Sequence, residues 1–278
     1  MNFTVGLPIR RVGADQSFAD PSFVRDAILF AEEAGFWGFT APDHIVAPRT
    51  WAEAGGGEEW IDPFALLGFA AGITTRIRLI THTIVLPYRT PFAVAKAVAS
   101  LDHLSGGRMV FGCGSGYLRE EFEILGVPFE ERGERADEAL RFVTACWAAD
   151  GDVELDGSFH SIHGARVAPR PAQRPRPPIW IGGNSMRAVR RTVEFGDCWT
   201  PFDITDDQMR EGLARAVELG RPVELAAPLG RVQQGDEVVA RADALRTLGA
   251  SYLKCGFGGR TPVAWFENAR WFTKELLE

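Results

Sequence analysis

Residues 91–121 read PFAVAKAVASLDHLSGGRMVFGCGSGYLREE, and this stretch contains the helix–strand–helix pattern from which the fold can be inferred. Pro91 suits the first turn of a helix, and the apolar residues after it recur at helical spacing. Ser105-Gly106-Gly107 ends that helix, and the apolar run Met109–Cys113 predicts a buried strand. A glycine-rich loop follows, and a further helix is expected to start near Tyr117. Strand and helix therefore alternate here, as in proteins with a mostly parallel sheet.

The same alternation continues along the whole chain. Asp20-Pro21 and Asp62-Pro63 predict two helix starts, and Thr205 with Gln208 predicts a capping box. The predicted strands are Phe3–Ile9, Trp37–Ala41, Ile77–Leu86, Met109–Cys113, Ile179–Ile181, Cys198–Trp199, Pro222–Ala227 and Tyr252–Phe257. The predicted helices include Arg132–Ala148, Ser185–Phe195, Asp236–Leu248 and Pro262–Leu277.

Eight strand–helix units in 278 residues predict a (β/α)8 barrel, a fold of about 250 residues. We therefore expect residues 1–278 to form one barrel domain. A small β-hairpin is expected near residues 152–168, with Asp156-Gly157 as its turn. A doubly wound open sheet would show the same alternation, but no GxGxxG sequence follows the first strand, which weakens that alternative.

The composition, with 46% hydrophobic and 24% charged residues, is typical of a soluble globular protein. The formal net charge of −7 argues against binding to nucleic acid or to an anionic membrane. No apolar run approaches the roughly 20 residues that span a bilayer, and the N-terminus lacks the apolar segment of a secretory signal. We therefore expect a cytoplasmic protein. No metal-ligand spacing is present, and the scattered cysteines are predicted to be reduced core residues: Cys113, Cys146, Cys198 and Cys255.

The loop after Met109–Cys113 is the first of two glycine-rich segments that follow a predicted strand. It contains Gly112, Gly114, Ser115 and Gly116. Backbone N–H groups in such a loop, next to a helix N-terminus, suit an anion. A tight turn that needs glycine only for its conformation explains the same residues equally well.

The second glycine-rich segment follows Ile179–Ile181. Gly182 and Gly183 end the strand, Asn184 is a candidate helix cap, and Arg187 lies in the first turn of the helix. Free N–H groups and a nearby guanidinium suit a phosphate. The alternative is a helix face whose arginines are simply solvated.

Asp43 and His44 form the third candidate site, just after the second predicted strand. An imidazole exchanges protons near neutral pH, and a neighbouring carboxylate can fix its tautomer. The alternative is a histidine with a structural hydrogen bond. The pair lies in an unusually long connection that also contains Trp51 and Trp60, and loops of that length are often functional.

Three segments resemble the bacterial luciferase-like monooxygenase superfamily in their order and spacing. They are GFTAPDHIV at 38–46, the stretch from IVLPYR to RADEAL at 84–140, and PPIWIGGNSMRAVRRTVEFGDCWTP at 177–201. Together they cover most of the first 200 residues, which makes the combination far more specific than any single motif. The sequence is most similar to the actinobacterial branch described as deazaflavin (coenzyme F-420)-dependent oxidoreductases.

This resemblance implies a luciferase-like (β/α)8 barrel with the cofactor ring over the strand ends. Asp43 and His44 would lie at the ring, and His44 would donate a proton or bind the substrate. A non-prolyl cis peptide would lie behind the ring, near Thr81, His82 and Thr83. The cofactor's ribityl chain and phosphate would be held by Gly112, Gly114, Ser115, Gly116, Tyr117, Gly182, Gly183, Asn184 and Arg187.

Two departures from the family pattern matter. In the sugar-phosphate dehydrogenases of the superfamily an acidic residue follows the glycine loop, whereas this chain has Tyr117, with Glu120 and Glu121 further on. This argues against a sugar-phosphate substrate and leaves His44 as the proton-transfer candidate. The chain is also shorter after Trp199, which predicts a more open substrate pocket.

We expect hydride transfer between reduced coenzyme F-420 and a small organic substrate held near Trp51 and Trp60. One alternative is an FMN-dependent monooxygenase that receives reduced flavin from a separate reductase. Another is a non-catalytic flavin-binding protein. Similarity also suggests a homodimer.

Overall fold

The alternating strand and helix signals correspond to a closed barrel in the computed structural model, which describes residues 1–8, 18–57, 59–232, 234–258 and 261–277. Among these residues, eight parallel strands follow one another around the barrel, and the last pairs with the first. This confirms the (β/α)8 fold and excludes the open sheet. In spatial order the strands are β1 (Asn2–Gly6), β2 (Gly38–Ala41), β3 (Arg78–Thr81), β5 (Met109–Gly114), β8 (Ile179–Gly182), β9 (Cys198–Thr200), β10 (Glu224–Val232) and β11 (Tyr252–Phe257).

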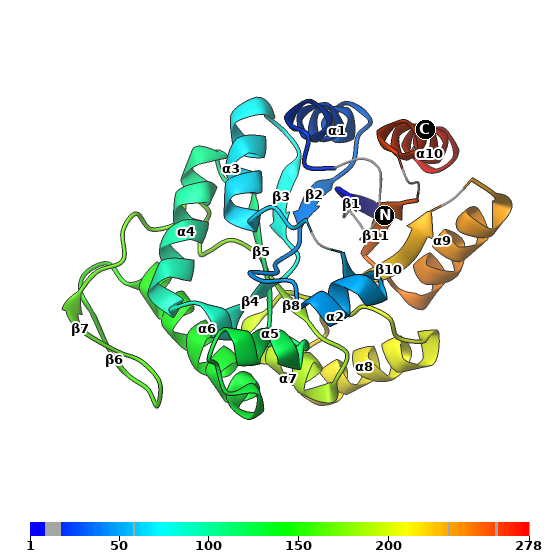
Figure 1. Cartoon of the computed structure of the whole chain (residues 1–278). Coiled ribbons are helices and arrows are strands. Elements are labelled where there is room, and N and C mark those ends of the chain that lie inside the picture. The colour runs from blue at the N-terminus through cyan, green and yellow to red at the C-terminus, as the bar shows by residue number, and fades with distance from the viewer. Residues whose placement is uncertain (9–17, 58, 233, 259–260, 278) are drawn as a thin grey trace.

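Helices surround the barrel on its outside (Figure 1). The predicted Asp-Pro starts are confirmed, because Asp20 and Asp62 each accept two backbone N–H hydrogen bonds from the first helical turn. The predicted capping box of Thr205 with Gln208 is also present. The outer helices are α1 (Pro21–Glu33), α3 (Pro63–Ile73), α4 (Pro91–Leu104), α6 (Arg132–Ala148), α7 (Met186–Phe195), α8 (Asp206–Glu218), α9 (Asp236–Leu248) and α10 (Pro262–Leu276).

Apolar side chains form two layers, one between strands and helices and one inside the barrel. The inner layer contains Ile80, Val110, Trp180, Cys198 and Ala226, against which Trp37 and Tyr252 pack. The Trp37 and Trp180 rings are stacked, with centroids 5.8 Å apart. These residues lie near the starts of their strands, so they fill the amino-terminal half of the barrel and leave the carboxyl end for a site.

The predicted strand Ile77–Leu86 is interrupted and is therefore wrong as a single strand. It divides into β3 and the two-residue β4 (Ile84–Val85), both of which pair with β5. Ile80 pairs with Val110 and Ile84 with Cys113, so three residues on one side lie opposite two on the other. This extra residue forms a bulge. The peptide bond between His82 and Thr83 is cis, at the place where the family resemblance implied one.

Glycine is required where the neighbouring strands face this bulge. A Cβ atom at Gly112 would lie 1.8 Å from the carbonyl oxygen of Thr81. A Cβ atom at Gly182 would lie 2.9 Å from Cγ2 of Thr83. One at Gly114 would lie 3.4 Å from the Thr83 hydroxyl, which is an ordinary contact, so Gly114 is not required in the same way. Gly112 of β5 and Gly182 of β8 thus let the bulge enter the barrel.

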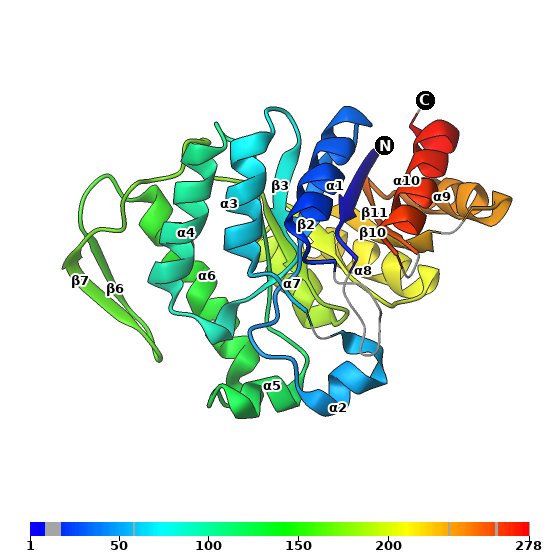
Figure 2. The same cartoon turned by 45° about the horizontal axis from the view of Figure 1, so that its top comes forward.

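The hairpin consists of β6 (Val153–Asp156) and β7 (Ser161–Ala165), which pair antiparallel and project away from the barrel (Figures 1 and 2). Its predicted turn at Asp156-Gly157 is wrong, since four residues separate the strands. Glu138 of α6 holds this longer turn by accepting hydrogen bonds from the N–H groups of Ser158 and Phe159.

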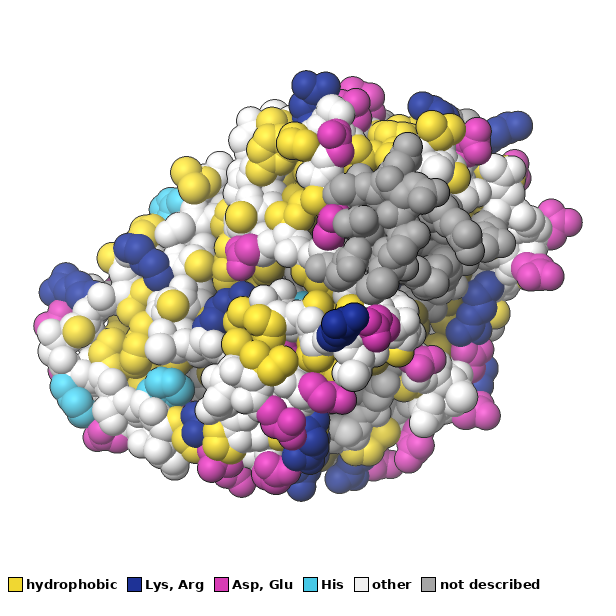
Figure 3. All heavy atoms as spheres, in the orientation of Figure 1, with side chains coloured by type: hydrophobic (Ala, Val, Ile, Leu, Met, Phe, Trp, Pro, Cys, Tyr) yellow, Lys and Arg dark blue, Asp and Glu magenta, His cyan; other side chains and the backbone are white. Residues whose placement is uncertain are grey.

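The cysteines and two strand bounds can also be compared with the predictions. The four cysteines are free and buried, as predicted. β10 extends beyond the predicted Pro222–Ala227, and β1 ends at Gly6, while Ile9 lies outside the described residues. No helix in the described part of the chain is long and apolar enough to cross a membrane. Acidic and basic side chains are interspersed on the face shown in Figure 3.

We predict that Gly112→Ala destabilises the protein by about 3 kcal/mol or more, because the methyl group would overlap the backbone of the bulge. Urea unfolding monitored by circular dichroism measures the change. Gly256→Ala is the matched control, because Gly256 also lies in a strand but a Cβ atom there meets no atom within 4 Å. Equal stability of the two variants would contradict this account.

Candidate active site at the carboxyl end of the barrel

All three sequence-predicted segments lie at one end of the barrel. Asp43 and His44 follow β2, the bulge follows β3, and the two glycine-rich segments follow β5 and β8. Because the strands are parallel, their carboxyl ends meet at the same end of the barrel, where active sites of this fold are found. The short helices α2 (Arg49–Trp51) and α5 (Arg119–Ile124) lie beside each other at that end (Figure 2).

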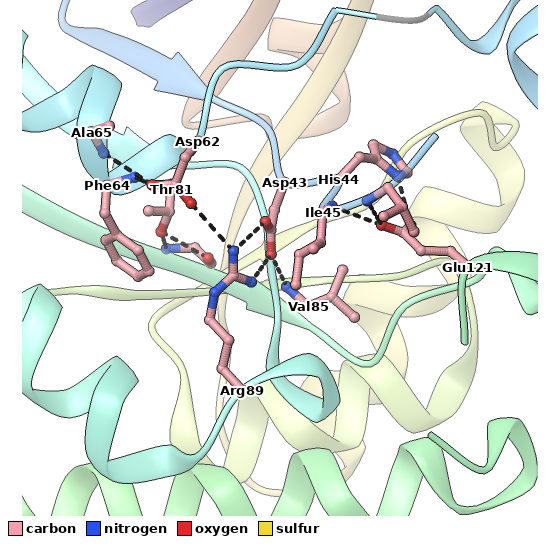
Figure 4. A network of polar contacts seen from close by, with 12 residues as sticks. Asp43, His44, Ile45, Asp62, Phe64, Ala65, Thr81, Val85, Arg89 and Glu121 are labelled. Carbon is pink, nitrogen blue, oxygen red and sulfur yellow. Dashed lines mark hydrogen bonds and ion pairs between the residues drawn. The ribbon is translucent and has the colours of Figure 1, made fainter. Parts of the chain in front are cut away.

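His44 is held by Glu121 of α5, as Figure 4 shows. Nδ1 of His44 lies 2.8 Å from a carboxylate oxygen of Glu121. The other oxygen accepts hydrogen bonds from the N–H groups of Ile45, at 2.8 Å, and Val46, at 3.2 Å. An ionised carboxylate only accepts hydrogen bonds, so Nδ1 donates, and Nε2 makes no hydrogen bond with the described residues.

The Glu121 carboxylate is fully buried, with a side-chain exposure of 0%. Burial by itself raises its pKa, but hydrogen bonds from His44, Val46 and Ile45 outweigh that effect and lower the pKa below its ordinary value. Glu121 therefore stays ionised at neutral pH and places a negative charge next to the imidazole.

Aromatic rings surround the imidazole. The ring centroids of Trp51 and Trp60 each lie 4.5 Å from that of His44, and that of Tyr117 lies 6.0 Å away. Gly56 packs closely on Trp51, because a Cβ atom there would lie 2.3 Å from the indole ring. The structure thus places both tryptophans of the long connection against the proton-transfer candidate.

Asp43 has a different partner from the one expected. Its carboxylate forms a bidentate pair with Arg89, at 2.6 and 2.9 Å, and accepts a hydrogen bond from the N–H group of Val85 at 2.9 Å (Figure 4). The expectation that Asp43 fixes the tautomer of His44 is therefore wrong, because the guanidinium occupies both oxygens. Asp43 instead ties the loop after β2 to the segment after the bulge.

The glycine-rich segments combine packing and binding groups. Gly112 and Gly182 lie too close to the bulge for a Cβ atom, and Gly116 has a φ of +79° and packs on Phe122 and Val85. Backbone conformation and packing therefore account for these three glycines. Ser115 and Gly183 are half-buried, whereas Tyr117 and Arg187 are exposed.

The helix cap in the second segment differs from the prediction. Ser185, not Asn184, caps α7 by accepting a hydrogen bond from the N–H group of Ala188. The side chain of Asn184 accepts a hydrogen bond from the N–H group of Phe202 at 3.0 Å and so fixes the next loop. Arg187 makes no ion pair with the described residues, and it lies in the first turn of α7, where an anion is favoured.

The side chains of Thr81 and His82, at the bulge, hydrogen-bond to different strands of the barrel. The Thr81 hydroxyl is buried and hydrogen-bonds both the carbonyl and the N–H group of Gly112. His82 crosses the barrel, and its Nε2 lies 2.9 Å from the Thr200 hydroxyl. Burial, followed by the positive charge of Lys254, holds the pKa of His82 well below its usual value, so this histidine is neutral. Among the described residues no cluster of His, Cys, Asp and Glu could hold a metal ion.

Glu121 and Arg89 are the residues that sequence reasoning missed. Glu121 is one of five acidic residues in the segment 120–131 that follows the glycine loop, and no spacing distinguishes it from Glu120. Arg89 ends the sequence IVLPYR, which belongs to the stretch that resembles the family, but no role was predicted for it. Fold and site together define a (β/α)8-barrel protein with an oriented histidine at the carboxyl ends of its strands.

Comparisons with known proteins agree with this class. A family model of luciferase-like monooxygenases matches residues 1–257. The uncharacterised protein Rv0940c of Mycobacterium tuberculosis is 30% identical over 224 residues, which are 77% of this chain and 76% of that protein. The chain therefore belongs to the luciferase-like monooxygenase family, whose members are oxidoreductases.

Solved structures share the fold over the whole chain. Monooxygenase RslO1 from Streptomyces bottropensis has a TM-score of 0.83 at 21% identity, with 100% of this chain and 99% of that chain covered. An F420-dependent secondary alcohol dehydrogenase, solved with an F420–acetone adduct, has a TM-score of 0.79 at 14% identity and the same coverage.

We predict that Glu121→Gln lowers the free energy of unfolding at pH 7 by about 2 kcal/mol, the value of hydrogen bonds to a charged group. Because the pKa of Glu121 is lower in the folded than in the unfolded chain, its stabilising effect is present above the ordinary value of about 4.3. It is lost as the pH falls through the lowered pKa, so the difference between wild type and variant should shrink there. Denaturant unfolding at several pH values measures this difference.

The exposed neighbour Glu120 provides the matched control. Glu120→Gln should leave stability nearly unchanged at every pH. A Glu121→Gln effect that does not diminish in acid would show that the carboxylate charge is not what holds the loop.

Proposed function

We propose that this protein transfers a hydride from reduced coenzyme F-420 to a small organic substrate, with His44 as the proton donor. The observation that carries the proposal is the oriented His44, fixed by buried Glu121 and enclosed by Trp51 and Trp60 at the carboxyl end of the barrel. Membership of an oxidoreductase family and the shared fold of an F420-dependent alcohol dehydrogenase support it.

The residues at the strand ends suit a phosphorylated flavin-like cofactor. Ser115 is a half-buried hydroxyl in the loop after β5, and Arg187 is an unpaired guanidinium in the first turn of α7. These groups would hold the phosphate. His82 and Thr83, half-buried on the bulge, would support the ring. When bound, the deazaflavin supplies the hydride.

His44 would move the proton that balances this hydride. Its Nδ1 donates to Glu121, so a proton that His44 transfers would leave from Nε2. The hydrogen bond to Glu121 also holds the ring in this orientation. Proton donation from Nε2 to a carbonyl oxygen, imine nitrogen or alkene carbon then leaves a neutral histidine in a single tautomer.

The enclosing rings indicate the substrate class. Trp51, Trp60 and Tyr117 line His44, and Phe202 lies 5.6 Å from Tyr117 between ring centroids. Such walls favour planar, apolar molecules and keep water away from the reacting atoms. We propose an unsaturated ketone, imine or activated alkene as the substrate.

Titration of the purified protein with coenzyme F-420 and with FMN tests the choice of cofactor. We predict that F-420 binds at least about tenfold more tightly, a difference of about 1.4 kcal/mol. Fluorescence quenching of either cofactor measures its dissociation constant. Tight binding of FMN without binding of F-420 would refute the deazaflavin proposal.

We predict that His44→Ala lowers turnover by about 100-fold or more, the usual contribution of a positioned acid. The affinity for the cofactor should stay nearly unchanged, since His44 acts on the substrate. Oxidation of reduced F-420 with a panel of ketones, imines and activated alkenes gives the rates. His163→Ala, on the exposed hairpin, is the control and should retain full turnover. Unchanged turnover of His44→Ala would remove this residue from the mechanism.

A second candidate is a monooxygenase that uses reduced FMN supplied by a separate reductase. The full-length similarity to monooxygenase RslO1 and the family's own description favour it. Substrate-dependent oxygen consumption driven by reduced FMN would support this candidate. Complete insensitivity of turnover to oxygen would exclude it.

A further inference from the structure

Lys254 lies inside the barrel, where a charged side chain is unusual. Its neighbours Leu253 and Cys255 face the outer apolar layer, so the alternation of a strand turns Lys254 inward. The ammonium donates a hydrogen bond to the carbonyl oxygen of Pro201 at 2.5 Å. Part of the side chain remains accessible, as part of His82 does.

Lys254 and His82 converge on consecutive residues at the end of β9. His82 crosses from β3 to the hydroxyl of Thr200, and Lys254 reaches from β11 to Pro201. We call these four residues the barrel floor, because they span the barrel above the inner apolar layer. The barrel floor adjoins the bulge, because His82 belongs to both and its next neighbour in the chain is Thr83.

Thr4 adds an unsatisfied polar group at this place. It pairs in register with Lys254 on the adjacent strand and also points inward, because Phe3 and Val5 face the outer layer. Its side chain is fully buried, and its hydroxyl has no hydrogen-bond partner among the described residues. A buried hydroxyl without a partner, on the residue in register with Lys254, indicates a polar group that water or a ligand would satisfy.

The charges around Lys254 identify the kind of ligand. Burial lowers the pKa of Lys254 to about 7, and no carboxylate among the described residues pairs with it. The two titratable groups that interact electrostatically with Lys254 are neutral, because burial lowers the pKa of His82 and raises that of the Cys198 thiol. The barrel floor therefore holds an amine that lacks a negative partner, and a bound anion would favour its charged form.

We propose that Lys254 is the counter-charge for the negative charge that the cofactor's ring carries in its reduced form. This inference rests on the proposed function, because the bulge that would support the ring adjoins the barrel floor. A reduced flavin or deazaflavin ring loses a proton and spreads the resulting negative charge over its pyrimidine part. Lys254 thus favours the reduced over the oxidised cofactor and is a positioning and tuning residue, distinct from His44.

The ratio of the dissociation constants for oxidised and reduced cofactor tests this proposal. Both forms of F-420, and both forms of FMN under anaerobic conditions, are titrated into wild type and Lys254→Met. The variant should bind the reduced form at least about tenfold more weakly relative to the oxidised form, which corresponds to about 30 mV for a two-electron couple. Lys274→Met, an exposed lysine of α10, should leave the ratio unchanged.

The outcomes separate this proposal from the proposed function. Normal binding with an unchanged ratio in Lys254→Met overturns the role of Lys254 alone. Failure of the wild type to bind either cofactor overturns the proposed function and this inference with it. Lys254→Gln keeps a hydrogen-bond donor without the charge and replaces Lys254→Met if that variant does not fold; it must show the same loss.

Discussion

The close approach of β3 to β5 at Gly112 shapes the carboxyl end of the barrel. A Cβ atom there would lie 1.8 Å from the backbone of Thr81, so only glycine lets the bulge enter. The bulge in turn sends His82 across the barrel to Thr200 and places Thr83 against the glycines of β5 and β8. The positions of His82 and Thr83, which would meet a cofactor ring, thus depend on the close contact between the backbones of Thr81 and Gly112. That contact is possible only because Gly112 has no side chain.

Two buried carboxylates fix the loop that carries His44. Asp43 joins the start of this loop to Arg89 and to the backbone after the bulge, while Glu121 joins its continuation to α5. The two carboxylates have different partners, so one positions the loop and the other also orients the imidazole. This division explains how a loop with little regular structure holds a histidine in one orientation between two tryptophans.

The sequence predicted the barrel well because its signals are local. Asp-Pro helix starts, apolar runs and a capping box each act within a few residues, and the helix Arg132–Ala148 has the predicted bounds. His44 and its tryptophans were also predicted, since they share one loop. The partners of His44 and Asp43 were not, because they come from distant segments and only the fold selects Glu121 over Glu120. The sequence also cannot distinguish a glycine that exposes its N–H group to an anion from one that makes room for a neighbouring backbone.

The central claim is that a flavin-like cofactor lies on the bulge with His44 facing its substrate side. A crystal structure of the protein soaked with its tightest-binding cofactor tests this claim most directly. We predict the ring against His82 and Thr83, with Nε2 of His44 facing the space above it and the phosphate near Ser115 and Arg187. A ring bound elsewhere, for example in the outer groove lined by Tyr88, Arg135 and His160, would contradict the account.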